Sequence, residues 1–326
     1  MEPIAQQYMD EELRGVGSIR RSEPERERAP ARTRWIPWSY FSPAEGISLR
    51  GWHCEPSGRP VIHFMHDGGL CCRAYEPLLD RLGERFDLWL CDIQGHGDSD
   101  QGGTFLGWES NARLALLAFE EHAHYFGNVD RFAVGHGLGG AVTALMLASD
   151  SARFERAIVL NPILLGAHGV LRTKRSCEAL TRQVDLMTRA AQDRQESWPS
   201  RADAIRGLSR GRGIYRDWSR AATEAFVKHA LREVGDGVAL KCRPHTHAAY
   251  FRTAPGDLWP ALTQVSTPVL AICAQSSYSF VLSAVEQWKQ LNPCVQSLAI
   301  PGGHFYMQER RDCGAAPIES FLLDGS

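Results

Sequence analysis

The residues that bear most directly on chemistry lie at a glycine-rich turn, where residues 135–140 read Gly-His-Gly-Leu-Gly-Gly. The turn follows a short apolar run (131–134) and precedes a run of helix-forming residues (141–148). A strand, a sharp turn and a helix in this order form the elbow that presents a nucleophilic serine in the pattern G-x-S-x-G. The central position here is Gly137, which has no side chain. We therefore predict that the turn is kept while its nucleophile position is vacant.

A glycine at this position also changes the strain of the turn. A nucleophile at such an elbow usually adopts a positive φ, which costs a non-glycine residue about 1–3 kcal/mol. Glycine adopts the same conformation at little steric cost. Replacing serine by Gly137 would therefore remove the nucleophile and relieve the strain together.

Three further polar motifs follow apolar runs that we expect to be strands. The first is His-Asp-Gly-Gly at 66–69, and the second is Asp-x-x-Gly-His-Gly-x-Ser at 92–99. The third is Pro-Gly-Gly-His at 301–304. Each lies at a strand-to-loop junction, where loops carry binding and catalytic residues on a rigid scaffold.

Together the four motifs, in this order over about residues 60–310, resemble the α/β-hydrolase family, and its lid-bearing esterases and lipases in particular. The resemblance implies that 66–69 forms an oxyanion loop, that 92–99 is a structural turn, and that His304 occupies the position of the catalytic histidine. It also implies an oxyanion hole or pocket that includes His66, Asp67, Gly68, Gly69, His136 and Leu138.

The catalytic residues depart from the family pattern at three positions. Gly137 replaces the nucleophile, and no carboxylate follows the strand expected at 267–273. Asn161, after an earlier strand, is a possible acid position, but an amide lacks the charge that stabilises an imidazolium. Asp67 stands where an oxyanion loop has glycine, and its charge would oppose a developing oxyanion unless it faces away. His304 remains, either as a general base or as a relic kept for packing.

These departures leave three hypotheses open. In the first, which we favour, the chain has lost serine-type ester hydrolysis and binds a small ester, acyl or lactone-like ligand, or a protein partner. In the second, it is an active hydrolase or lyase in which His304 activates water or abstracts a substrate proton, with Asp67 or Asn161 orienting the ring. In the third, it is an engineered or variant inactive form of an ordinary serine hydrolase, although the missing carboxylate argues against this.

The surrounding pattern predicts the scaffold. Strand-like and helix-like segments alternate, which is typical of a mostly parallel sheet flanked by helices. We predict an α/β-hydrolase-like core over 35–163 and 259–326, with a helical lid inserted at 164–258. Basic residues outnumber acidic ones over 172–220, so the lid could attract an anionic ligand. Residues 1–34 are rich in Arg and Glu and poor in apolar residues, which predicts a disordered tail.

Composition excludes several other classes. The formal net charge of −2 does not favour nucleic acid as a partner. We expect no secretory signal and no membrane span, because no apolar run approaches the length that either needs. The nine cysteines are scattered without C-x-x-C spacing, which favours free thiols in the cytoplasm. Paired histidines such as those at 245 and 247 lack further ligands at suitable spacing, so we predict no metal and no cofactor. The sequence makes no prediction of oligomeric state.

Overall fold

The computed structural model of the protein describes residues 34–165, 174–210, 214–255, 258–309 and 312–324. The predicted tail at 1–34 lies outside the described residues, apart from Arg34.

The main sheet has eight strands in the order β1-β2-β4-β3-β5-β6-β10-β11. The first two form an antiparallel hairpin, β2 pairs antiparallel with β4, and every pair from β4 to β11 is parallel. This confirms the predicted mostly parallel sheet. The strands are β1 (Trp35–Ser42), β2 (Ile47–Cys54), β3 (Val61–Met65), β4 (Asp87–Asp92), β5 (Arg131–His136), β6 (Arg156–Leu160), β10 (Val269–Ser276) and β11 (Val295–Gly303).

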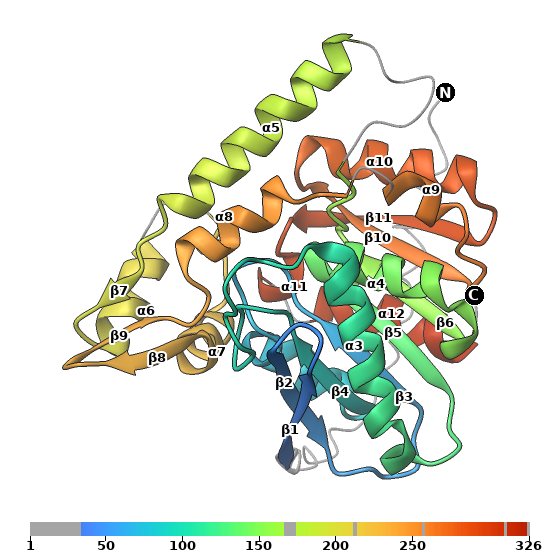
Figure 1. Ribbon diagram of the computed structural model, residues 1–326, viewed down its shortest axis with the longest axis horizontal. Helices are drawn as coiled ribbons and strands as arrows, with labels where there is room; N and C mark the ends of the chain where they lie inside the picture. Colours follow the sequence, from blue (N-terminus) through green and yellow to red (C-terminus); the bar gives the residue numbers. More distant parts are fainter. Residues whose placement is uncertain (1–33, 166–173, 211–213, 256–257, 310–311, 325–326) are drawn as a thin grey trace, which may run out of the picture. The chain divides into compact units, whose positions relative to one another are not determined.

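Helices cover both faces of this sheet (Figure 1). On β3, Val61 and Met65 belong to one hydrophobic core while Ile62 and Phe64 belong to the other, because side chains alternate across a strand. The first core includes α3 (Trp108–His122), α4 (Leu138–Ser149), α9 (Leu258–Leu262) and α10 (Ser279–Leu291). The second includes η1 (Cys72–Tyr75), α2 (Glu76–Leu82), α11 (Tyr306–Glu309) and α12 (Asp312–Asp324). Two further single-turn helices are η2 (Ala123–Phe126) and η3 (Ser151–Arg153).

The segment between β6 and β10 is not wholly helical, which corrects the prediction of a helical lid. Ahead of α9, the described part of this segment contains a small antiparallel sheet in the order β7-β9-β8 beside four helices. Figure 1 shows α5 and α8 side by side, with this sheet at one end of the segment. The elements are α5 (Lys174–Gln192), β7 (Ser197–Trp198), α6 (Arg201–Arg210), α7 (Arg220–Ala230), β8 (Leu231–Val234), β9 (Gly237–Leu240) and α8 (Pro244–Arg252).

These strands were missed because they are short and β8 is largely exposed, so it shows no hydrophobic alternation. The available signal was the Gly235-Asp236 pair, since Gly235 adopts φ 55° and such pairs close two-residue hairpins.

The carboxyl ends of the parallel strands bring distant residues together. Asp67 follows β3, Gly137 follows β5 and Asn161 follows β6. Ser277 directly follows β10, and His304 directly follows β11. Ligands of open α/β sheets bind at this edge, and the site is built there.

Candidate active site

The elbow predicted from the sequence is present, and Gly137 lies between β5 and α4 with φ 54°. Its amide donates to the carbonyl oxygen of Leu160 at 2.9 Å. Glycine therefore suits the backbone, but the surroundings add a second reason. A Cβ at Gly137 would lie 2.0 Å from Oδ1 of Asp67, which is closer than any real contact. The carboxylate of Asp67 occupies the space that a nucleophile's side chain would need.

Asp67 is held in that space by two backbone amides. Its Oδ1 accepts hydrogen bonds from the amides of Gly68 and Leu138, each at 2.7 Å. The Leu138 amide opens α4, where the helix dipole favours an anion. The other carboxylate oxygen of Asp67, Oδ2, lies 3.2 Å from Nε2 of His304. Amides so placed would serve an oxyanion, and here they bind the protein's own carboxylate.

The environment of Asp67 keeps its side chain ionised. Burial alone would raise the pKa of this carboxyl group, but the hydrogen bond and charge of His304, with help from His136 and the Leu138 amide, hold the pKa well below its usual range. The site therefore contains a fixed negative charge. Asp67, which carries this charge, is only 8% exposed.

This pKa shift predicts how acid affects stability. Because the folded-state pKa of Asp67 lies below the unfolded value of about 3.9, its ionisation stabilises the protein above that value, and the contribution is lost as pH falls through the folded pKa. We expect the free energy of unfolding of the wild type to fall more steeply between about pH 5 and pH 2 than that of Asp67→Asn. Urea titrations at several pH values measure both. Parallel slopes for the two proteins would contradict the shift.

His304 has partners on both ring nitrogens. Nε2 faces Asp67, while Nδ1 lies 2.9 Å from Oγ of Ser277. In the neutral ring, the ionised Asp67 requires the proton on Nε2, so the lone pair of Nδ1 accepts from the Ser277 hydroxyl. Ser277 was missed in the sequence because a carboxylate was sought at that position. Its place directly after β10 was the available signal.

Asn161 does not face the His304 ring, although the sequence made it a possible acid position. Its Nδ2 donates to the carbonyl oxygen of His304 at 2.8 Å, and its Oδ1 accepts from the amide of Ala274 at 2.8 Å. His136 also bonds that carbonyl through Nε2 at 2.9 Å, and its Nδ1 lies 2.6 Å from the Tyr75 hydroxyl. Asn161 and His136 therefore position the backbone of His304.

The remaining predicted pocket residues support the loops. His66 accepts from the amide of Ile93 through Nε2, and its Nδ1 lies 2.8 Å from the carbonyl oxygen of Asp67. The amide of Gly69 donates to Nε2 of His96 at 2.9 Å. Two groups with metal-ligand chemistry occur among the described residues, one around His66 and one around His136. In each group that histidine already uses both ring nitrogens, so neither offers a free one.

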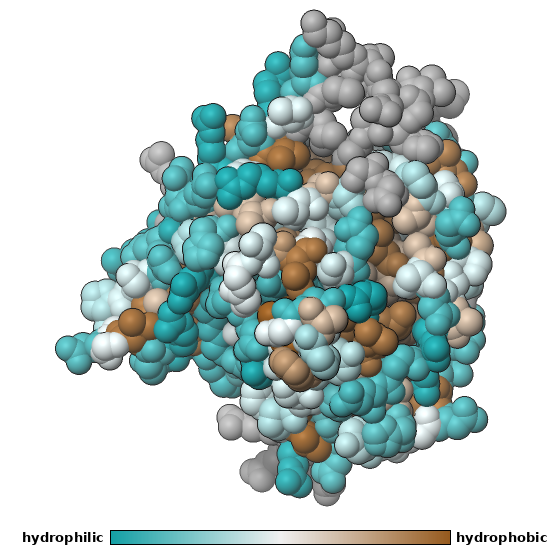
Figure 2. Space-filling view, viewed as in Figure 1, coloured by the Kyte–Doolittle hydropathy of each residue, from teal (hydrophilic) through white to brown (hydrophobic). Residues whose placement is uncertain are grey.

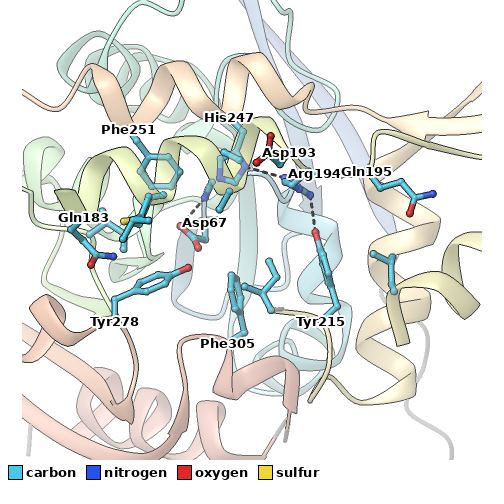
Figure 3. A pocket seen from close by; sticks show the side chains of 18 of the residues that line it. Asp67, Gln183, Asp193, Arg194, Gln195, Tyr215, His247, Phe251, Tyr278 and Phe305 are labelled. Atoms are coloured by element: carbon cyan, nitrogen blue, oxygen red, sulfur yellow. Dashed lines mark hydrogen bonds between the residues drawn. The ribbon is translucent and has the colours of Figure 1, made fainter. Parts of the chain in front are cut away.

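A cavity of about 560 Å³ opens beside Asp67, between the core and the segment that joins β6 to β10. Figure 3 shows Asp67 at this cavity, with Phe251 and His247 on one side and Tyr278 and Phe305 on the other. Apolar side chains line much of it, including Ile163 and several residues of α5 and α6. Its shape and lining suit a small organic ligand.

Arg194 is a cationic group in the same cavity. One guanidinium nitrogen donates to Nδ1 of His247 at 3.1 Å, the other to the Tyr215 hydroxyl at 2.7 Å, and both reach the carbonyl oxygen of Gly69 at 3.2 Å. Burial, with the charge of Arg194, lowers the pKa of His247 to about 3. Within the described ranges, no carboxylate forms an ion pair with Arg194. Asp193 also lines the cavity but is exposed, so solvent screens its charge.

Comparison with known proteins agrees with this architecture. The sequence profile of the alpha/beta hydrolase family matches residues 64–313, more than half of the chain. A 2-(acetamidomethylene)succinate hydrolase from Mesorhizobium japonicum is 27% identical over 267 residues, covering 78% of this chain and 84% of that protein. A monoglyceride lipase from Rattus norvegicus is 28% identical over 130 residues, covering 37% of this chain and 42% of that protein.

Solved structures show the same fold. A crystal structure of E-2-(acetamidomethylene)succinate hydrolase superposes with a TM-score of 0.72 at 20% identity, covering 89% of this chain and all of that one. A peroxisomal alpha-beta-hydrolase from Saccharomyces cerevisiae superposes with a TM-score of 0.68 at 14% identity, covering 90% of each chain. In the described part of this chain, no helix is long and apolar enough to cross a membrane.

Proposed function

The chain belongs to the α/β-hydrolase family, and from this premise we propose that it has lost acyl-serine chemistry at the elbow and binds a small anionic acyl or ester-like compound in the cavity beside Asp67. The observation that carries this proposal is the Asp67 carboxylate, which fills both the nucleophile space at Gly137 and the amide pair of Gly68 and Leu138. A substrate carbonyl oxygen cannot use amides that already bind an anion.

The charges of the cavity support the chemical class of the ligand. Arg194 would pair with an acid group of the ligand, because guanidinium binds carboxylates through paired hydrogen bonds. The exposed part of the Asp67 carboxylate would accept from a ligand N–H or O–H. A relative whose name gives an acetamido-substituted succinate as its substrate supports such a compound. The seven cysteines that the structure describes are all free, which supports a cytoplasmic protein.

The face of the molecule shown in Figure 2 offers less support for a protein partner than the cavity does for a small molecule. On the face shown in Figure 2, hydrophobic residues form small patches separated by hydrophilic ones. Specific protein interfaces need a larger continuous area. A small molecule enclosed by the cavity is therefore the ligand we propose.

Calorimetry with monomethyl succinate and N-acetylglycine tests the ligand class. We expect Arg194→Gln to weaken binding about 10-fold or more, because a charge-assisted hydrogen bond contributes about 1.5–3 kcal/mol. Arg189→Gln is the matched control, since Arg189 is exposed near the end of α5 and does not line the cavity. Equal binding by the wild type and Arg194→Gln would overturn the assignment of Arg194.

Loss of acyl-serine chemistry is tested on p-nitrophenyl esters of short and medium acids. We expect the steady-state turnover of these esters by the wild type, measured after the first equivalent of p-nitrophenol, to be no faster than that of His304→Ala. A wild type clearly above this background would favour a second candidate function, in which the site remains catalytic.

In that second candidate, the site hydrolyses its ligand or abstracts a proton from it. The observation in its favour is that Asp67 lines the cavity while contacting His304. The basic nitrogen of His304 faces Ser277, so Asp67 would be the group that accepts a proton from water or ligand. Its lowered pKa makes it a weak base, and for this reason ligand binding is the better-supported function.

A further inference from the structure

We propose that Ser277 is a reactive nucleophile, activated by His304 and Asp67, and that it accepts an acyl or phosphonyl group from an activated donor. The proposal concerns a residue outside the cavity lining, so it goes beyond the proposed ligand binding. It rests on the three side chains that meet at the ends of β3, β10 and β11.

The three side chains form the order carboxylate, imidazole, hydroxyl. Oδ2 of Asp67 lies 3.2 Å from Nε2 of His304, and Nδ1 of His304 lies 2.9 Å from Oγ of Ser277. A hydroxyl within 2.6–3.2 Å of a base that a third group orients is the arrangement that activates a nucleophile. In a triad with its nucleophile at residue 137, the carboxylate would bond Nδ1 of the histidine and the hydroxyl would bond Nε2. Here the carboxylate bonds Nε2 and the hydroxyl bonds Nδ1.

Asp67 is rigid enough to set the direction of this array. The amides of Gly68 and Leu138 hold Oδ1, so only Oδ2 is directed at the imidazole. Ring rotation is limited as well, because the imidazole of His304 packs against the rings of Tyr278 and Phe305, with ring centroids 4.5 and 5.0 Å apart. The lone pair of Nδ1 is therefore held toward Ser277.

Ser277 is also within reach of a reagent. It is half-buried in the loop between β10 and α10, beside Ser276, which is exposed. The next residue, Tyr278, lines the cavity and packs on His304 with ring centroids 4.5 Å apart. A donor can therefore approach the hydroxyl from the loop.

The reaction balances without a further co-reactant. Oγ of Ser277 attacks the carbonyl carbon or phosphorus of the donor and forms the new bond, while its proton passes to Nδ1 of His304. Asp67 stabilises the imidazolium formed in this step. The bond to the leaving group breaks, the leaving group takes the proton from His304, and an ester remains on Ser277.

A fluorescent fluorophosphonate probe tests the proposal on the full chain, with the labelled peptide located by mass spectrometry. We expect label on Ser277 in the wild type and in Ser276→Ala, and none on this peptide in Ser277→Ala. Asp67→Asn should slow labelling about 10²-fold or more, within the range of general base catalysis. Label elsewhere only, or equal labelling rates in the wild type and His304→Ala, would overturn the proposal.

A second variant keeps the result independent of folding defects. Ser277→Cys should react with iodoacetamide at residue 277 faster than Ser277→Cys combined with His304→Ala, with melting temperatures recorded for both. Equal rates in folded proteins would count against activation by His304. Calorimetry and labelling are separate readouts, so failure of anionic ligand binding leaves the Ser277 proposal standing, and the reverse also holds.

Discussion

Gly137→Ser alone is expected to give no ester hydrolysis above the His304→Ala background. The new Cβ would lie 2.0 Å from Oδ1 of Asp67, and the amides of Gly68 and Leu138 would still bind that carboxylate. The serine would also lack a base, because Nε2 of His304 faces Asp67 as a donor. Restoring the nucleophile therefore restores neither the space nor the oxyanion site.

The triple variant Asp67→Gly, Gly137→Ser and Ser277→Asp is expected to hydrolyse p-nitrophenyl esters at least about 10²-fold faster than Gly137→Ser, since one oxyanion donor contributes about 10²–10³. Removing Asp67 frees the amides. A carboxylate at 277 would accept a hydrogen bond from Nδ1–H of His304, which keeps the ring proton on Nδ1 and leaves Nε2 as the base. Initial rates measured side by side, with melting temperatures, check both results. Brisk turnover by Gly137→Ser alone would show that Asp67 leaves the elbow easily.

Asp67→Ala is expected to lower the free energy of unfolding by about 3–5 kcal/mol, because it removes one partner of a buried pair. The amides of Gly68 and Leu138 and the His304 ring would lose their acceptor. The vacated site matches a small carboxylate, so acetate or formate should restore part of the loss, about 2.7 kcal/mol at a concentration 100 times its Kd.

Urea unfolding with and without acetate measures this rescue. Asp87→Ala is the matched control, because Asp87 is also buried, at 2% exposed, but accepts from Ser57 away from the cavity. We expect acetate to stabilise Asp67→Ala and to leave Asp87→Ala unchanged. The same acetate response in both variants would show a general effect of the salt on stability and would contradict specific binding of acetate at the Asp67 site.

The sequence predicted the scaffold well because its signals are local. The conformations of the apolar run of β3 and of the glycine-rich turn at 135–140 are each indicated by a few neighbouring residues. The elbow, the vacancy at Gly137 and the location of His304 after β11 could all be predicted this way. The antiparallel strands β8 and β9 were missed because four-residue strands in a charged segment carry little such signal.

The site itself depends on contacts between distant residues. The sequence identified Asp67 as out of place but could not show that its carboxylate lies in the space beside Gly137, which is 70 positions later in the chain. Side-chain direction at a loop is set by packing that the sequence does not display. Ser277 was missed for the same reason, since its hydroxyl becomes relevant only once His304 is seen to face it.

A crystal structure of the wild-type protein at neutral pH tests the central claim most directly, namely that Asp67 occupies the elbow. The account predicts Oδ1 of Asp67 within hydrogen-bonding distance of the amides of Gly68 and Leu138, with Oδ2 facing His304. A carboxylate turned away, with water or a bound anion on those two amides, would contradict it. The site would then have an open oxyanion hole, and loss of acyl-serine chemistry would rest on Gly137 alone.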